Sequence, residues 1–242
     1  HVAFCAGGLL PRDSERDPER DRELTFGPLR ATLDALADRP ETRLTYLSSG
    51  GTIYGEPAHV PVREEDPAEP TSVYGRHHLD CEREIDAARR EHGLRARVLR
   101  CSTVYGEHQR PDRGQGAIVT FLHRIERELP IELFGGESTI RDYVYARDIA
   151  RTVLFSGIQE DGPDLLNVGS GEGTSLEEVL ELTEAQVGRP AVVHKHAERA
   201  FDVHRIVLDV ERLRTWSGFE PTPLATGVAR THAWLKELDG DG

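Results

Sequence analysis

The alternation of short apolar segments with longer amphipathic ones is the feature that most constrains the fold of this chain. Residues 1–6, 43–47 and 96–99 are apolar runs of strand length, and residues 24–37 and 73–91 between them carry apolar side chains at helical spacing. Strands that alternate with helices in this way predict a parallel sheet with right-handed crossovers. We therefore expect an α/β fold built around one parallel sheet.

The second half of the chain predicts a mixture of helices and short strands. A capping box, Ser175-Leu176-Glu177-Glu178, begins a helix that ends near Val187. The helix over 73–91 is expected to end at a glycine cap, Gly93. The other expectations are helices over 117–128, 146–155, 210–216 and 224–238, strands over 131–133, 165–168 and 192–193, a charged, solvated loop over 11–22 and a proline-rich loop over 57–70.

The composition favours a soluble protein and argues against several classes of partner. The net charge of −13 argues against a nucleic-acid-binding surface, and no apolar run approaches the roughly 18 residues of a membrane helix. Cys5, Cys81 and Cys101 are an odd number at wide spacing, which predicts free buried thiols in a reducing cytoplasm. Nothing in these patterns indicates a metal site. Lys195 and Lys236 are the only lysines, so arginine supplies nearly all of the 30 basic residues.

Three segments place reactive side chains where open α/β sheets bind ligands, at the carboxyl ends of strands. Residues 48–55, SSGGTIYG, follow a predicted strand with hydroxyls and a tightly turning backbone. Tyr74 and His78 are four residues apart and share one helix face, where a cation lowers the pKa of a tyrosine. Arg141 and Arg199 suit a diphosphate because guanidinium groups make paired hydrogen bonds. Taken singly, these segments are better explained as a turn, a packed helix start and a charged surface.

Six motifs follow one another along almost the whole chain. They are SSGGTIYGE at 48–56, an acidic proline-rich loop ending in SVYG at 72–75, LR and VYG within 99–106, RDYVY and DIA within 141–150, NVGSG at 167–171, and RAFDV at 199–203. In this order and spacing they resemble the extended short-chain dehydrogenase/reductase family, and within it the NAD-dependent epimerases and dehydratases of the UDP-glucose 4-epimerase-like group.

The resemblance implies a Rossmann-like, doubly wound parallel sheet with a smaller C-terminal α/β lobe for the substrate. Residues 1–106 would form the Rossmann-like domain and residues 107–242 mainly the lobe, with 141–168 returning to the Rossmann core. The match begins at about the family's fourth strand, and the chain has no methionine. We therefore expect roughly sixty to seventy residues upstream of His1, the usual size of two βα units and a third strand, with a glycine-rich loop for the cofactor pyrophosphate.

The resemblance also implies roles for individual residues. Tyr74 is expected to be the acid/base. Because the family's serine position aligns with Gly50, the assisting hydroxyl would come from Ser49 or Thr52. His78 stands where the family has a lysine that lowers the tyrosine pKa and holds the nicotinamide ribose. The expected cofactor contacts are Ala6, Gly7, Ser48, Tyr74 and His78, and the expected substrate contacts are Thr103, Arg141, Asn167 and Arg199.

Histidine in place of that lysine predicts weaker activation of Tyr74. Imidazole is mostly neutral at pH 7 because its unperturbed pKa is about 6.5. We expect slow turnover or none at neutral pH, with an increase when His78 is protonated.

The function implied by the resemblance is NAD-dependent epimerisation of a nucleotide-diphosphate sugar, at C4, by transient hydride transfer. A nucleotide-sugar 4-ketoreductase and a catalytically impaired homologue that binds nucleotide sugars are the alternatives, and NADP is the alternative cofactor. Gly51-Thr52 replaces the Asp-Glu pair of the family's dehydratases, which argues against dehydration. The resemblance further implies a homodimer formed through two helices, one of which carries Tyr74.

Overall fold

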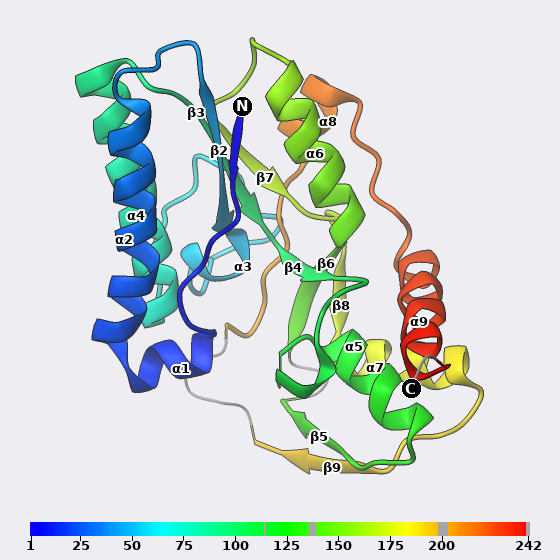
Figure 1. The fold of residues 1–242 in the computed structure, drawn as a ribbon. Coiled ribbons are helices and arrows are strands. Elements are labelled where there is room, and N and C mark those ends of the chain that lie inside the picture. The colour runs from blue at the N-terminus through cyan, green and yellow to red at the C-terminus, as the bar shows by residue number, and fades with distance from the viewer. Residues whose placement is uncertain (114, 136–138, 198–202, 241–242) are drawn as a thin grey trace.

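A four-stranded parallel sheet is the centre of the computed structural model, which describes residues 1–113, 115–135, 139–197 and 203–240. Its strands, in the order β1-β2-β3-β7, are β1 (Val2–Phe4), β2 (Arg43–Ser49), β3 (Arg95–Cys101) and β7 (Leu165–Val168) (Figure 1). β2 and β3 pair along their whole lengths and end together, with Ser49 opposite Cys101. All three neighbouring pairs are parallel, so their carboxyl ends share one edge of the sheet.

Helices cover both faces of this sheet. α2 (Pro18–Leu36) and α4 (Val73–His92) lie on one side, and α6 (Ala146–Ile158) and α8 (Glu211–Ser217) lie on the other (Figure 1). Each layer buries its own apolar cluster against the strands, because each helix turns its apolar side chains inward. The predicted parallel, doubly wound α/β fold is confirmed.

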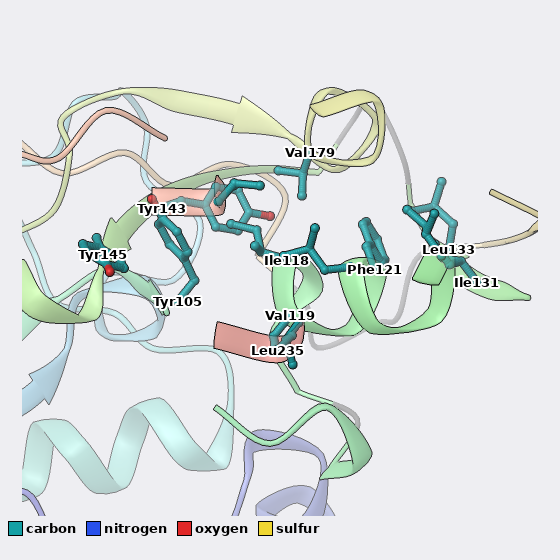
Figure 2. Packing of buried hydrophobic residues seen from close by; sticks show 13 residues of the cluster. Tyr105, Ile118, Val119, Phe121, Ile131, Leu133, Tyr143, Tyr145, Val179 and Leu235 are labelled. Atoms are coloured by element: carbon teal, nitrogen blue, oxygen red, sulfur yellow. The ribbon is translucent and has the colours of Figure 1, made fainter. Parts of the chain in front are cut away.

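Smaller sheets and three helices form a lobe at one end of the main sheet (Figure 1). The strands are β4 (Thr103–Tyr105), β5 (Ile131–Phe134), β6 (Ile140–Tyr145), β8 (Gly173–Ser175) and β9 (Val193–His196), and the helices are α5 (Ala117–Glu126), α7 (Leu176–Val187) and α9 (Leu224–Gly240). A 3-10 turn, Pro111–Arg113, precedes α5. Figure 2 shows the core of this lobe, where Ile118 and Phe121 of α5 pack among apolar side chains from strands and helices. The division of the chain at residue 106 stays a prediction.

β6 contributes side chains to two cores. Successive side chains of a strand point to opposite faces. Tyr143 and Tyr145 accordingly belong to the core of the lobe, and Val144 between them belongs to the cluster under α6 and α8. The strand therefore couples the packing of the lobe to that of the main sheet.

Two predicted helix boundaries are confirmed by their caps. Gly93 ends α4 in the left-handed conformation, with φ of 66°, where a glycine has no Cβ to strain the backbone. Ser175 and Glu178 form the expected capping box of α7, with Ser175 Oγ 3.1 Å from Glu178 N and Glu178 Oε2 2.7 Å from Ser175 N.

The predicted loop over residues 11–22 is wrong, because this segment is helical. α1 (Pro11–Arg16) precedes α2, and each helix has a proline at its first position, where the missing N–H costs nothing. Asp17 caps α2 by accepting a hydrogen bond from Arg20 N at 3.0 Å. The charge density of the segment concealed these start signals.

Other differences are local. Residues after β2 form a short helix, α3 (Gly50–Ile53), in place of a plain turn. Cys81 and Cys101 are free and buried as predicted, but Cys5 is exposed in the loop after β1. Across the described ranges, no helix is both long and apolar enough to cross a membrane.

Candidate active site

A cleft opens at the carboxyl ends of β1, β2 and β3, with a volume of about 450 Å³. Parallel α/β sheets bind ligands at this edge, because the loops after the strands leave a crevice there. The cleft brings together most of the predicted site residues: Ala6, Gly7, Ser48, Ser49, Thr52, Tyr74, His78, Thr103 and Arg141.

Tyr74 and His78 reach the cleft from the first turns of α4. Ser72 caps this helix, its Oγ accepting a hydrogen bond from Gly75 N at 3.1 Å. The two side chains lie one turn apart, and their ring centroids are 4.4 Å apart. The shared helix face inferred from their spacing therefore exists, and both residues line the cleft.

His78 is buried against the sheet and carries no charge at neutral pH. Its side chain is 6% exposed, and its Nδ1 lies 2.9 Å from the hydroxyl of Tyr46 on β2. Burial lowers the pKa of His78 to about 4, although the nearby carboxylate of Asp21 acts in the opposite direction. The imidazole is consequently neutral at pH 7.

Tyr74 is protonated in the same surroundings. Burial raises the pKa of Tyr74 to about 12, and the negative charge of Asp21 adds to the effect. A neutral His78 provides no positive charge to offset these two contributions. The phenol is therefore a proton donor at pH 7.

Gly50, at the position where the family has a serine, leaves no room for a side chain. A Cβ at position 50 would lie 2.8 Å from the carbonyl oxygen of Arg100 and 2.7 Å from Cδ1 of Leu208, so a serine does not fit there. Ser49 and Thr52 line the cleft on either side, and Thr52 Oγ1 donates to Ser49 Oγ at 2.8 Å. The two hydroxyls thus form one polar group at the end of β2.

Ser48 belongs to a buried hydrogen-bond network beneath the cleft. Its Oγ donates to Glu82 on α4 at 2.6 Å, and Glu82 pairs with Arg100 of β3 at 2.7 Å. The ion pair is buried on both sides, and Arg100 also donates to the Tyr54 hydroxyl at 3.0 Å. This network joins β2, α4 and β3 directly below the site.

Asp21 organises the loop after β1. Its Oδ1 accepts from Leu9 N at 2.7 Å, and its Oδ2 lies 2.6 Å from Nδ1 of His77. The chain passes so close that a Cβ on Gly8 would overlap the side chains of Asp21 and Thr25. Sequence reasoning did not identify Asp21, because an acid in a highly charged segment gives no sign of being buried.

The two predicted substrate residues that line the cleft lie on its lobe side. Thr103 begins β4 and Arg141 lies on β6. Arg141 Nη1 donates to the carbonyl oxygens of Ile140 and His204, at 3.0 and 3.2 Å. These contacts hold the half-buried guanidinium at the cleft wall.

Asn167 does not line the cleft, and its predicted contact with the substrate stays a prediction. Asn167 is fully buried in β7, where its Oδ1 accepts from the Tyr54 hydroxyl at 2.7 Å and its Nδ2 donates to the Val62 carbonyl at 2.9 Å. Arg199 lies outside the described residues.

Tyr46, like Asp21, was not identified from the sequence. Side chains two apart on a strand share a face, so Tyr46 lies on the face that also presents Ser48 to α4. This alternation, combined with the four-residue spacing of His78 and Glu82 on α4, was the signal that would have found it. Gln109 and Gln115, from the loop before α5, also line the cleft.

The lysines lie far from this site. Lys195 on β9 is 71% exposed and binds Glu177 at 2.7 Å, and Lys236 is exposed on α9. Neither lines the cleft. Among the residues that the structure describes, no group of three or more His, Cys, Asp or Glu side chains is arranged to hold a metal ion.

The sequence of this chain is similar to those of known proteins. The sequence model described as the NAD dependent epimerase/dehydratase family matches residues 1–169. A dTDP-4-dehydro-6-deoxyglucose reductase from Escherichia coli is 32% identical over 221 residues, covering 91% of this chain and 70% of the relative.

Two solved structures share the fold over nearly the whole chain. The UDP-glucose 4-epimerase of Thermotoga maritima, with UDP-glucose, superposes with a TM-score of 0.93 at 28% identity, covering 98% of this chain and 77% of its own. The UDP-glucose 4-epimerase of Thermus thermophilus, in complex with NAD, superposes with a TM-score of 0.91 at 29% identity, with coverage of 98% and 77%.

Proposed function

This chain belongs to the NAD-dependent epimerase/dehydratase family, and we propose that it is an enzyme that epimerises a nucleotide-diphosphate sugar at C4 with bound NAD. The observation that carries the proposal is the cleft in which Tyr74 and His78 meet the hydroxyls of Ser49 and Thr52. The similar structures with UDP-glucose and with NAD support the choice of substrate class and cofactor.

The groups that line the cleft fit the nicotinamide half of NAD. The loop after β1 opens onto the cleft, since a Cβ on Gly7 would meet no atom within 4 Å. We assign Ala6, Gly7 and Ser48 to this half through their backbone, with Tyr74 and His78 as side-chain partners. NAD supplies the acceptor and donor of a hydride when it is bound.

The proton is handled by Tyr74 in this proposal. Tyr74 Oη exchanges a proton with the C4 oxygen of the sugar, which is a hydroxyl before hydride transfer and a carbonyl after it. Ser49 Oγ or Thr52 Oγ1 donates a hydrogen bond to the same oxygen and stabilises the charge that develops on it.

Residues on the lobe side of the cleft bind the substrate in this proposal. Arg141 and Arg199 bind the diphosphate, because a guanidinium offers two parallel donors to phosphate oxygens. Thr103 contacts the sugar. The acidic exterior of the protein does not prevent this, since local arginines dominate the potential inside a cleft.

A nucleotide-sugar 4-ketoreductase is the second candidate, and the state of Tyr74 favours it. A phenol whose pKa is raised to about 12 is poised to give a proton to a carbonyl oxygen rather than to remove one from a hydroxyl. The E. coli reductase among the relatives supports this alternative. Reduction needs only the proton-donating half of the epimerase cycle.

The function is tested by incubating the purified full-length protein with NAD and UDP-glucose, and with NADH and a UDP-4-ketosugar, from about pH 6 to about pH 9. Interconversion of the C4 epimers supports the epimerase, and reduction alone supports the ketoreductase. Absence of both reactions, with tight binding of UDP-glucose measured by calorimetry, identifies a binding homologue. Absence of NAD binding together with absence of turnover rejects the proposal.

Tyr74→Phe is expected to lower turnover by at least about a hundredfold, the usual contribution of a proton-transfer group. Tyr105→Phe is the matched control, because it removes a buried hydroxyl whose partner is the Leu224 carbonyl in the lobe. Equal turnover in the two variants would contradict the role of Tyr74.

We also propose a homodimer that uses the α2–α4 side of the sheet, and a cytoplasmic location. The free thiols of Cys5, Cys81 and Cys101 support the second assignment. NADP is the alternative cofactor, and binding measurements with both dinucleotides distinguish them.

A further inference from the structure

The face of β2 that meets α4 carries two polar contacts in register. Tyr46 and Ser48 point from this face, and His78 and Glu82, one helical turn apart, meet them. Glu82 accepts a hydrogen bond from Ser48 and also forms a buried ion pair with Arg100. The contact between Tyr46 and His78 belongs to no such ion pair, and His78 lines the cleft.

The imidazole of His78 is oriented by this contact. Its Nδ1 lies 2.9 Å from the Tyr46 hydroxyl, and the two side chains are 6% and 1% exposed. Within the described part of the chain this is the only hydrogen bond of the ring, and Nε2 is not among the fully buried atoms that lack a partner. Nε2 is therefore the ring nitrogen that is accessible from the cleft.

The chemistry of the pair determines where the protons lie. Burial raises the pKa of the Tyr46 phenol well above 10, so its oxygen keeps its hydrogen. The thiol of Cys81 also interacts with this hydroxyl, but sulfur is a weak acceptor and imidazole nitrogen a strong one. The Tyr46 hydroxyl accordingly donates to Nδ1. A neutral imidazole that accepts at Nδ1 carries its hydrogen on Nε2.

We propose that Tyr46 is a positioning residue that holds His78 in the tautomer with hydrogen on Nε2, so that this nitrogen donates a hydrogen bond from the cleft wall to a hydroxyl of the nicotinamide ribose. The ribose contact rests on the proposed function. The tautomer does not, because it is a property of the protein alone. The pair reproduces the hydrogen bond of a lysine at position 78 without its charge.

The tautomer is measured directly by nitrogen NMR on protein labelled in its histidine rings. The protonated and unprotonated ring nitrogens have well-separated resonances, and a His78→Gln variant identifies those of His78 by their loss. The expected result in the native protein at neutral pH is a protonated Nε2 and an unprotonated Nδ1. A protonated Nδ1, or an even mixture of tautomers, would overturn the proposal.

The role of Tyr46 is tested by Tyr46→Phe, with Tyr105→Phe as the control for loss of a buried hydroxyl elsewhere. In Tyr46→Phe the Nδ1 resonance of His78 is expected to shift and the tautomers to mix, because the hydrogen bond to Nδ1 is gone. The control should leave the His78 resonances in place. Unchanged His78 resonances in a folded Tyr46→Phe protein would show that Tyr46 does not set the tautomer.

The ribose contact has its own readout, the affinity for NAD without substrate. Tyr46→Phe should weaken binding about tenfold, the worth of roughly one hydrogen bond, and Tyr105→Phe should not. Equal affinities in the native protein and Tyr46→Phe would overturn the contact. Absence of NAD binding by the native protein rejects the proposed function and the ribose contact with it, while the NMR result still decides whether Tyr46 holds His78.

Discussion

Two adjacent histidines on α4 show how strongly the local environment decides what one residue type does. His77 faces the carboxylate of Asp21 at 2.6 Å, whereas His78 faces the phenol of Tyr46 at 2.9 Å. The first contact ties α4 to the loop after β1, and the second fixes a ring at the wall of the cleft. Position along the helix, and not residue type, separates the two roles.

The low pKa of His78 makes stability depend on pH. The unfolded imidazole has a pKa of about 6.5 and the folded one about 4, so between these values the unfolded state binds more protons. The contribution of the neutral ring is present above about pH 6.5 and is lost as the pH falls towards 4, on the order of 3 kcal/mol in all. Urea unfolding of the native protein and of His78→Gln should show their difference shrinking between about pH 7.5 and about pH 4.5. His92→Gln, at the exposed end of α4, is the control, and a pH-independent difference for His78→Gln would contradict the prediction.

His78→Lys is expected to restore the missing charge. An ammonium beside Tyr74 should lower its pKa from about 12 by at least about one unit, equivalent to about 1.4 kcal/mol. Absorbance titration, with His78→Lys/Tyr74→Phe as the blank, measures the shift, and turnover should rise in parallel. His92→Lys places the same side chain far along the helix as a control. A lowered pKa without a gain in turnover would show that the histidine does not limit catalysis.

At this scale the sequence predicts which residues can meet but not how they are used. The spacing of Tyr74 and His78 is local, so their shared helix face could be inferred. Burial lowers the pKa of His78 and raises that of Tyr74, and it comes from β2 and the loop after β1, which are distant in sequence. The burial of Asn167, whose amide bonds to Tyr54 and Val62, could not be inferred for the same reason.

At the scale of elements, the Glu82–Arg100 pair joins β2, α4 and β3. Removing one member of a buried ion pair leaves an uncompensated charge, which costs about 3–5 kcal/mol. Arg100→Leu should lower the free energy of unfolding by about this amount. Glu82→Leu/Arg100→Leu should lower it less than Arg100→Leu alone, because neither charge remains. Denaturant unfolding of Glu82→Leu, Arg100→Leu and the double variant checks this order. A double variant destabilised by the sum of the two single losses would contradict it.

The capping box of α7 offers a smaller test at the same scale. Ser175→Ala should cost about 1 kcal/mol, because Glu178 N loses its partner at the start of the helix. Ser217→Ala, which removes a hydroxyl bonded within α8 to the Leu213 carbonyl, should cost clearly less. If denaturant unfolding gave equal losses in the free energy of unfolding for Ser175→Ala and Ser217→Ala, the cap would contribute no more than an ordinary helical serine.

Elements were predictable where their signals are local. The caps of α4 and α7 and the apolar runs of β2 and β3 lie within a few residues of the structures they determine. β4, β6 and β8 were not predicted, because each exists only through pairing with a partner distant in the chain. The helices over residues 11–22 were missed because their charges outweighed the proline and aspartate signals.

At the scale of the whole molecule, we expect the main sheet and the lobe to unfold together, because β6 packs into the cores of both. Leu44→Ala in the core against α2 and α4, and Leu122→Ala in the core of the lobe, should each cost about 2–5 kcal/mol. Trp216 packs in the cluster under α6 and α8 against the main sheet, and Trp234 packs in the core of the lobe. Trp216→Phe and Trp234→Phe backgrounds therefore give one fluorescence probe for each unit. Both probes should report the same lowered midpoint in either variant. Separate midpoints would indicate independent units.

The two lysines have a practical consequence. Both lie on the lobe, on β9 and α9, so reagents that acylate side-chain amines modify that periphery and leave the cleft untouched. His78→Lys would then place a single nucleophilic amine at the cleft wall. That variant would accept a fluorophore or a crosslinker at one internal position, and a bound ligand would protect that position from the reagent.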